Sequence, residues 1–267
     1  MKSSYKVLFL VLSLILFSDL HSQTCSIPSA PVVSGSTLLP CVASGNFTLT
    51  ATPGASMNVG WYSFPYGGNA ISTNSVFVTP TLSTGATYYV GQSIITQANA
   101  SISLPGFVSG YSGNTRGMWF TAPTSFIITG LRVPTDVGGA SNTSIALMKL
   151  SAAPPAYPTT TNSFTTLFIN QNYAGLGIIP VYIPVYQGDV IGILGSRGNV
   201  TSYGSSGPFT ASLGTSTLTL NRLGMQFPLS TTLPQDLWTE AASIGRIEVY
   251  TDIGCLSPLA PVSVTVT

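Results

Sequence analysis

Charged residues are scarce in this chain. They make up 6% of its 267 residues, against about 25% in an average soluble protein. Eight lysines and arginines and seven aspartates and glutamates leave a formal net charge of +1. The basic residues form no cluster that could neutralise a row of phosphates. The composition therefore argues against a charge-rich disordered chain, and we expect no nucleic-acid partner.

Histidine is almost absent, and its one occurrence, His21, follows a leader-like segment. Lys2 and Lys6 precede an apolar run over residues 7–17, and small residues come after it, which is the pattern of a secretory signal peptide. The run is too short to cross a hydrocarbon core of about 30 Å. We therefore expect a signal peptide over residues 1–22 and a secreted or cell-surface protein with no membrane span in the mature chain.

Removal of the leader would leave the mature chain without histidine. Ser-His-Asp and Cys-His catalysis, histidine-ligated zinc and histidine pH switches are then excluded. The sequence also lacks a P-loop, a dinucleotide-binding fingerprint and a Gly-x-Ser-x-Gly elbow. It has no Asp-rich run of the kind that binds calcium. We expect no cofactor, no dedicated metal site and no enzymatic activity.

Strand-forming and turn residues dominate what is present. Hydrophobic residues make up 44% of the chain, which also contains 27 glycines and 19 prolines, and this mixture predicts an all-β protein. Between residues 32 and 90, short β-type runs recur at spacings of about 8–12 residues, as is typical of a β-sandwich. These runs cover residues 47–52, 59–64, 75–79 and 87–90.

The same region resembles a known family. Its motifs are Cys41, residues 45–53, Trp61-Tyr62, Gly67-Gly68, residues 77–80 and residues 86–90. Together they resemble the Ig-like repeat of secreted Bacteroidetes proteins, which closes with a Gly-Cys, a proline-rich step and an alternating Val/Thr strand. Here the closing segment comes only at residues 254–266, so the resemblance implies a repeat split by an insertion of about 150 residues. It implies a modular secreted or cell-surface architecture and no particular activity.

The split divides the mature chain into three parts: the first part of the Ig-like sandwich at residues 23–95, an insert at 96–251 and a closing strand at 252–267. Residues 100–108 and 246–251 are expected to pair as antiparallel strands and so bring the ends of the insert together. The insert has about nine β-type runs and no helical period, which predicts a jelly-roll-like β-sandwich. The expected strands are 118–121, 126–133, 144–150, 164–170, 178–185, 189–194, 213–220, 225–227 and 246–250.

Several local features refine this prediction. Pro180 and Pro184 within one run predict an edge strand or a bulge, because proline cannot donate to a ladder. Residues 187–189 predict a hairpin turn that enters a core strand. Trp61 and Trp119 lie in strand patterns and are expected in the cores.

Three cysteines allow at most one intramolecular disulfide. If the Ig-like repeat is split, Cys41 pairs with Cys255 and joins two segments of one sandwich. Cys25 lies in a stretch that echoes the one after Cys255, so Cys25 competes for the same partner or is left over for a link between chains.

Loops of the insert carry the residue types that hold sugars. Sugars are bound by aromatic platforms and by the planar hydrogen-bonding groups of arginine, asparagine and aspartate. The candidate ligand-binding residues are Arg116, Arg197, Asn199, Tyr203, Asp236 and Trp238. Structural alternatives stand beside two of them, because Asp189 could brace Arg197 in an ion pair and Trp238 could cover the core.

Asp236 and Glu240 flank Trp238 and form the one local carboxylate pair beside a sugar-stacking ring. Glycoside hydrolases use two carboxylates, so a carboxylate-based glycoside hydrolase is one alternative. Our main hypothesis is a non-catalytic adhesion or structural role at the cell surface. A carbohydrate-binding module of a polysaccharide-degrading system is the other alternative. The partners expected from these hypotheses are polysaccharides, cell-surface glycans and other surface proteins.

Overall fold

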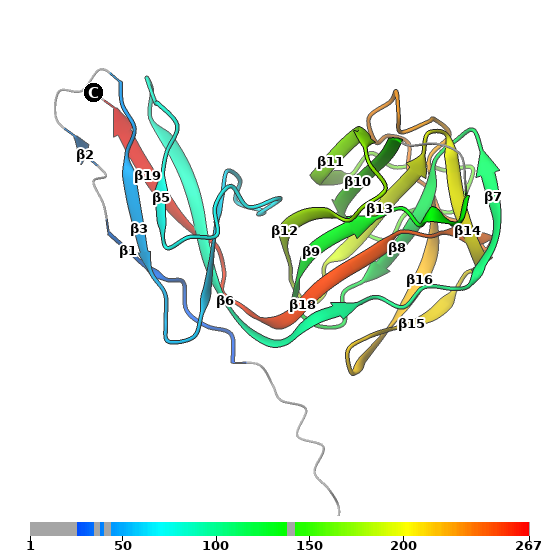
Figure 1. The fold of residues 1–267 in the computed structure, drawn as a ribbon, viewed down its shortest axis with the longest axis horizontal. Helices are drawn as coiled ribbons and strands as arrows, with labels where there is room; N and C mark the ends of the chain where they lie inside the picture. Colours follow the sequence, from blue (N-terminus) through cyan, green and yellow to red (C-terminus); the bar gives the residue numbers. More distant parts are fainter. Residues whose placement is uncertain (1–25, 35–37, 40–43, 138–141, 267) are drawn as a thin grey trace, which may run out of the picture.

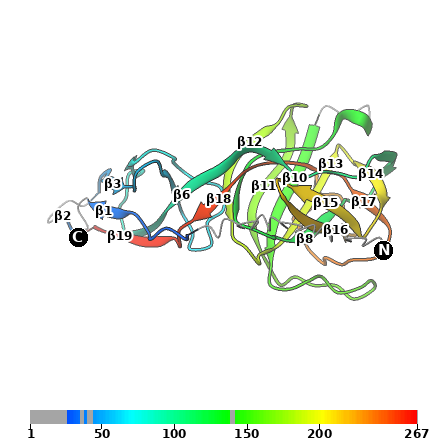
Figure 2. The same cartoon turned by 90° about the horizontal axis from the view of Figure 1, so that it is seen from below.

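The computed structural model describes residues 26–34, 38–39, 44–137 and 142–266. The predicted signal peptide lies outside this part of the chain, as do Cys25 and Cys41. Within it, the regular structure is β-strand apart from one 3₁₀ turn, η1 (Thr135–Val137), and no helix is long and apolar enough to span a membrane. The chain is all-β, as predicted, and forms two β modules side by side (Figure 1; Figure 2).

The first module is an Ig-like sandwich. One sheet has the order β1-β3-β5, and β4, β6, β19 and β2 belong to a seven-stranded sheet. In β3, Leu49 and Ala51 are buried while Thr48 and Thr52 are exposed, the alternation of a strand with one solvated face. The strands are β1 (Val32–Ser34), β2 (Leu38–Leu39), β3 (Thr48–Thr52), β4 (Asn58–Tyr62), β5 (Val76–Val78), β6 (Ala86–Ser101) and β19 (Ala260–Val266).

The core of this module combines both parts of the split domain. The rings of Trp61 and Phe77 lie 5.5 Å apart between centroids, and Trp61 is fully buried, as predicted. Val262 and Val264 of β19 belong to the same buried cluster. Because β19 pairs antiparallel with β6, the closing strand completes the sandwich as the resemblance implies.

The second module is a jelly roll. Counting β6 and β18, eight strands form two antiparallel sheets with the orders β6-β18-β9-β12 and β8-β13-β10-β11. Numbered along the chain, these are strands 1-8-3-6 and 2-7-4-5, the arrangement of two Greek keys in a jelly roll. The strands are β7 (Phe107–Ser112), β8 (Arg116–Thr121), β9 (Phe126–Arg132), β10 (Asn142–Leu150), β11 (Phe164–Ala174), β12 (Ile179–Val185), β13 (Val190–Arg197), β14 (Val200–Ser206), β15 (Phe209–Leu213), β16 (Ser216–Gly224), β17 (Ser243–Gly245) and β18 (Glu248–Leu256).

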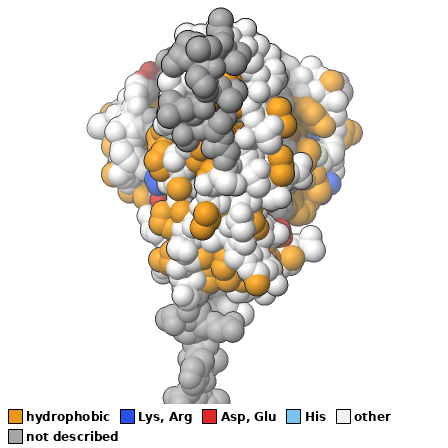
Figure 3. Space-filling model, turned by 90° about the vertical axis from the view of Figure 1, so that its left-hand side faces the viewer, with side chains coloured by type: hydrophobic (Ala, Val, Ile, Leu, Met, Phe, Trp, Pro, Cys, Tyr) orange, Lys and Arg blue, Asp and Glu red, His pale blue; other side chains and the backbone are white. Residues whose placement is uncertain are grey.

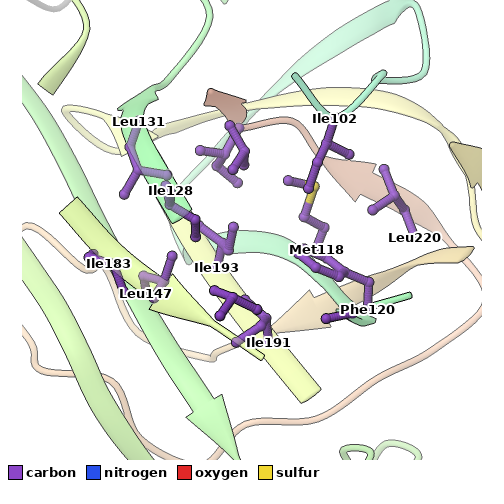
Figure 4. Packing of buried hydrophobic residues seen from close by; sticks show 14 of the residues in the cluster. Ile102, Met118, Phe120, Ile128, Leu131, Leu147, Ile183, Ile191, Ile193 and Leu220 are labelled. Atoms are coloured by element: carbon purple, nitrogen blue, oxygen red, sulfur yellow. The ribbon is translucent and has the colours of Figure 1, made fainter. Parts of the chain in front are cut away.

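The two sheets of the jelly roll enclose its main core. Met118 and Phe120 of β8 and Ile193 of β13 pack in the same buried cluster as Ile128 of β9 and Ile183 of β12 (Figure 4). The outer face of the β10–β13 sheet is also buried, because the loop after β16 covers it. The cluster beneath this loop comprises Ala146, Met148, Leu150, Leu194, Leu223, Met225, Leu229 and Leu237.

Strands β6 and β18 belong to both modules and run side by side from one to the other (Figure 1). Tyr250 pairs with Ser101 and Thr251 with Ala100, so the ends of the insert meet as predicted. The two expected boundaries of the insert, 95/96 and 251/252, fall inside these strands. The modules are therefore joined by a continuous sheet.

Some local predictions are wrong. The single strand expected at 213–220 is the hairpin β15–β16, which turns at Gly214 with a φ of 58°, a left-handed conformation that suits glycine. Residues 225–227 form no strand. The turn at 187–189 joins β12 to β13, which lie in different sheets, so it is a crossover and not a hairpin. The edge position of β12 is confirmed, and its register shifts after Pro180.

Candidate functional sites on the jelly roll

An arginine–aromatic cluster lies where β7, β8, β14 and β16 meet the loop after β16. Strand pairing places its members together, because β14 pairs with β7 and β16 pairs with β8. Trp238 reaches the cluster because its backbone exchanges hydrogen bonds of 2.9 and 3.1 Å with Gly224. The cluster comprises Tyr111, Arg116, Tyr203, Arg222 and Trp238.

The rings and guanidinium groups of this cluster contact one another in turn. The guanidinium carbon of Arg116 lies 4.9 Å from the Trp238 ring centroid and 5.4 Å from that of Tyr111. The corresponding distances from Arg222 are 5.6 Å to Trp238 and 5.3 Å to Tyr203. The Tyr111 and Tyr203 rings stack at 5.5 Å. These distances are those of cation–π contacts, which strengthen where water is excluded.

Both arginines are desolvated. Arg116 is 5% exposed and donates to the carbonyls of Thr115 and Met225 at 3.0 and 2.6 Å and to Gln226 Oε1 at 3.1 Å. Burial lowers the pKa of Arg116, and the neighbouring charge of Arg222 lowers it further, while Tyr203 acts in the opposite direction. Burial is also the main cause that raises the pKa of Tyr203.

The cluster is closed and has a packing role. Trp238 is 1% exposed, so it covers the core, which is the structural alternative weighed for it above. Its ring offers no open face to a sugar in this arrangement. The Nε atoms of Arg116 and Arg222 and Nε1 of Trp238 have no hydrogen-bond partner in the described part of the chain.

The other basic candidate, Arg197, is buried at the end of β13 with 2% exposure. Burial lowers the pKa of Arg197. An ion pair between Arg197 and Asp189 is not formed. Asp189 lies next to the opposite end of β13, and its Oδ1 is 2.6 Å from Lys149 Nζ. Asn199, in the turn after Arg197, is exposed and its Oδ1 accepts from Ser230 Oγ at 2.7 Å.

The two carboxylates that flank Trp238 have different partners. Asp236 and Asn162 form a reciprocal pair, since Asn162 Nδ2 donates to Asp236 Oδ1 and the Asp236 backbone N–H donates to Asn162 Oδ1, both at 2.8 Å. Glu240 Oε1 lies 3.4 Å from Arg222 Nη2. Across the described residues, no three His, Cys, Asp or Glu side chains gather in a way that could hold a metal ion.

Trp119, expected in a core, is only partly buried, and its Nε1–H donates to Thr239 Oγ1 at 2.9 Å.

An open cavity of about 440 Å³ lies where the Ig-like module meets the jelly roll. It is widely open to solvent, so a ligand bound there would stay partly exposed. Tyr66 comes from the loop between β4 and β5, and the remaining lining residues come from the β10–β11 hairpin. The lining comprises Tyr66, Lys149, Leu150, Ser151, Asn162, Ser163, Phe164 and Thr165.

None of the lining residues is among the candidates from the sequence, although Asp236 holds Asn162 in place. The signal that could have pointed here is the closely spaced aromatic pair Phe64 and Tyr66, which is followed at once by Gly67 and Gly68 in a loop. The cavity depends on contact between segments that are far apart along the chain, and strand patterns do not report such contacts.

The fold and these sites define a split Ig-like sandwich that carries an inserted jelly roll. Residues 28–102 match the family model described as Ig-like domain CHU_C associated. The match ends just after β6, where the chain enters the jelly roll, and it confirms the Bacteroidetes-type Ig-like domain. Domains of this kind are typical of extracellular Bacteroidetes proteins. No curated protein matches the chain.

Proposed function

We propose that this protein is a secreted or cell-surface adhesion protein without catalytic activity, in which the jelly roll is the recognition module. The observation that carries the proposal is the split: the CHU_C-associated Ig-like domain is interrupted after β6, and the chain returns to it through β18. The Ig-like module thereby serves as the carrier, and the jelly roll is presented on two of its strands.

The junction supports a fixed presentation. Besides the shared sheet, the loop between β4 and β5 packs on β12, where Ala70 N–H donates to the Tyr182 carbonyl at 3.0 Å. Tyr182 N–H in turn donates to Asn69 Oδ1 at 2.7 Å. Tyr186 of the jelly roll donates its hydroxyl to the Ser257 carbonyl at 2.9 Å. Contacts from several segments hold the two modules in one orientation.

The surface supports an uncharged partner. Figure 3 looks at the Ig-like end of the molecule and shows few charged side chains among uncharged polar and hydrophobic ones. Electrostatic steering needs clustered charge of one sign, and charged residues make up only 6% of the chain, with a formal net charge of +1. Recognition would instead rely on shape, hydrogen bonds and aromatic contacts.

The contacts of the two carboxylates support a non-catalytic role over a glycoside hydrolase. A hydrolase needs two carboxyl groups that flank one glycosidic bond. Asp236 is hydrogen-bonded to Asn162, and Glu240 lies beside the buried Arg222, so each has a structural partner.

We also propose that Cys255, which is buried at the end of β18, pairs with Cys41.

Two measurements test the proposal: where the protein is found in the cell, and whether it attaches beads to cell surfaces. The full-length chain with an internal tag is expressed in a Bacteroidetes host, and the tag is expected to be accessible to external protease or antibody on intact cells or to appear in the medium. Beads coated with residues 23–267 are expected to adhere to cell surfaces. Retention of the tag in the cytoplasm, or beads that adhere no better than uncoated ones, would contradict the proposal.

A further inference from the structure

We propose that the cavity between the Tyr66 loop and the β10–β11 hairpin binds uncharged sugar residues of a surface polysaccharide. This inference rests on the proposed adhesion function, and it names the ligand class and the site. It differs from the sequence-based site at Trp238, because that ring is buried and the rings beside the cavity are not.

The aromatic part of the site is exposed. The rings of Phe64 and Tyr66 stack with centroids 5.1 Å apart and an interplanar angle of 5°. Phe64 is 52% exposed and Tyr66 is 36% exposed, and of the two rings Tyr66 lines the cavity while Phe64 stacks on it. A ring face that is open to solvent can pack against the C–H face of a sugar, while the Tyr66 hydroxyl remains free to hydrogen-bond.

The loop that carries these rings is held in place. Gly67 has a φ of 84°, and a Cβ there would come within 2.8 Å of Pro184 in β12, so the backbone lies directly on the jelly roll. The next glycine, Gly68, has the same φ and lies against the Leu167 carbonyl. A platform fixed in this way loses little conformational entropy when a ligand binds.

The opposite wall places uncharged polar groups beside the apolar Leu150 and Phe164 and the ion-paired Lys149. Ser151 Oγ lies 2.8 Å from the Ser163 carbonyl and 2.6 Å from Ser163 Oγ. Asn162 is oriented by Asp236 and keeps a second Nδ2 hydrogen for a ligand. Hydroxyl and carboxamide groups both donate and accept hydrogen bonds, as sugar hydroxyls do.

The charge at the site selects against acidic sugars. Lys149 is the one cation in the lining, and its ammonium lies 2.6 Å from Asp189 Oδ1. Asp236, on the far side of Asn162, adds a further negative charge. A uronate or a sulfated sugar would meet no uncompensated cation in this lining, whereas a neutral sugar meets hydroxyls, a carboxamide and an aromatic face.

The test is affinity gel electrophoresis of residues 23–267. The gels contain mannan, mixed-linkage β-glucan, xylan or dextran as neutral probes and polygalacturonate as the acidic probe. Wild type, Tyr66→Ala, Asn162→Ala and the matched control Tyr157→Ala are compared. Tyr157 is 51% exposed and lies next to Trp238, outside the cavity. Thermal melting establishes that each variant is folded.

We expect retention of the wild type by at least one neutral probe and not by polygalacturonate. Tyr66→Ala and Asn162→Ala are expected to raise the Kd at least tenfold, and Tyr157→Ala to change it less than twofold. Equal retention of all four proteins, or loss only in Tyr157→Ala, would overturn the cavity as the site. Adhesion of coated beads without retention by any neutral probe would overturn the sugar assignment and leave the adhesion function standing.

Discussion

Asn162 and Asp236, which are 74 positions apart, hold each other through two hydrogen bonds of 2.8 Å. Asp236 adopts a left-handed backbone with a φ of 49°, a conformation that aspartate and asparagine tolerate better than most residues. The pair fixes the loop after β16 to the β10–β11 hairpin and orients a carboxamide in the lining of the cavity.

This pair predicts different effects for two substitutions. Asp236→Ala removes the acceptor of Asn162 Nδ2 and is expected to weaken polysaccharide retention several-fold. Asp236→Asn keeps an acceptor oxygen and the left-handed backbone, so it should retain affinity close to wild type. Affinity gels measure both. If the wild type released reducing sugar from a polysaccharide and Asp236→Asn did not, Asp236 would be a catalytic carboxylate. That result would refute the positioning role.

Trp238 is predicted to stabilise the fold. Its buried ring contacts Arg116, Arg222 and Tyr157, so Trp238→Ala should lower the free energy of unfolding by about 3–5 kcal/mol. Leu233→Ala in the same loop, at a side chain that is 64% exposed, should change it by less than about 0.5 kcal/mol. Urea unfolding monitored by circular dichroism compares the two. Similar values for both would show that the ring does not pack as described.

Gly224 is predicted to be required for the approach of Trp238. A Cβ at Gly224 would lie 2.3 Å from the Trp238 ring, so Gly224→Ala should destabilise the protein by about 1–3 kcal/mol through overpacking. At Gly106 a Cβ would meet nothing within 4 Å, and Gly106→Ala serves as the control. A Gly224→Ala protein as stable as the control would contradict this packing.

Ionisation of three tyrosines at the junction between the modules is expected to destabilise the folded protein at alkaline pH. Burial raises the pKa of Tyr186 to about 12, and burial also raises the pKa values of Tyr62 and Tyr182. Because the folded state binds these protons more tightly than the unfolded state, the stabilisation is complete below about pH 10 and is lost as the pH rises toward 12. Tyr186 alone accounts for up to about 2–3 kcal/mol of this change.

The measurement is chemical unfolding at a series of pH values from 8 to about 12, with absorbance at 295 nm to follow tyrosine ionisation. Tyr186→Phe lacks the hydroxyl that donates to Ser257 and should show a shallower fall in stability above pH 10. An unchanged slope in this variant would assign the alkaline effect to other groups.

The cysteine pairing is predicted from the split domain. A disulfide between Cys41 and Cys255 would link the first part of the Ig-like sandwich to its return strand, and Cys255→Ser should cost about 2–4 kcal/mol of stability. Cys25→Ser should have little effect. Peptide mapping under non-reducing conditions identifies the linked pair, and a peptide that joins Cys25 to Cys255 would reverse the assignment.

The layout of the chain could be predicted because it depends on local patterns. Alternation in β3, the Pro180 and Pro184 edge strand and the closing strand β19 each follow from residues within a few positions of one another. The candidate site could not be predicted in the same way. Trp238 and Tyr66 both lie in loops, and which ring is buried depends on the surface that each loop meets. The loop of Trp238 covers an apolar sheet face, whereas the rings of Phe64 and Tyr66 remain exposed.

The two strands that join the modules also determine how a mechanical load is shared. A ligand held by the jelly roll pulls on β6 and β18 together, because both pass into the Ig-like module as hydrogen-bonded neighbours, from the Tyr250–Ser101 pair to the Leu256–Ser93 pair. The pull acts on both strands in the same direction, so their ladder is carried along as a unit and is not sheared.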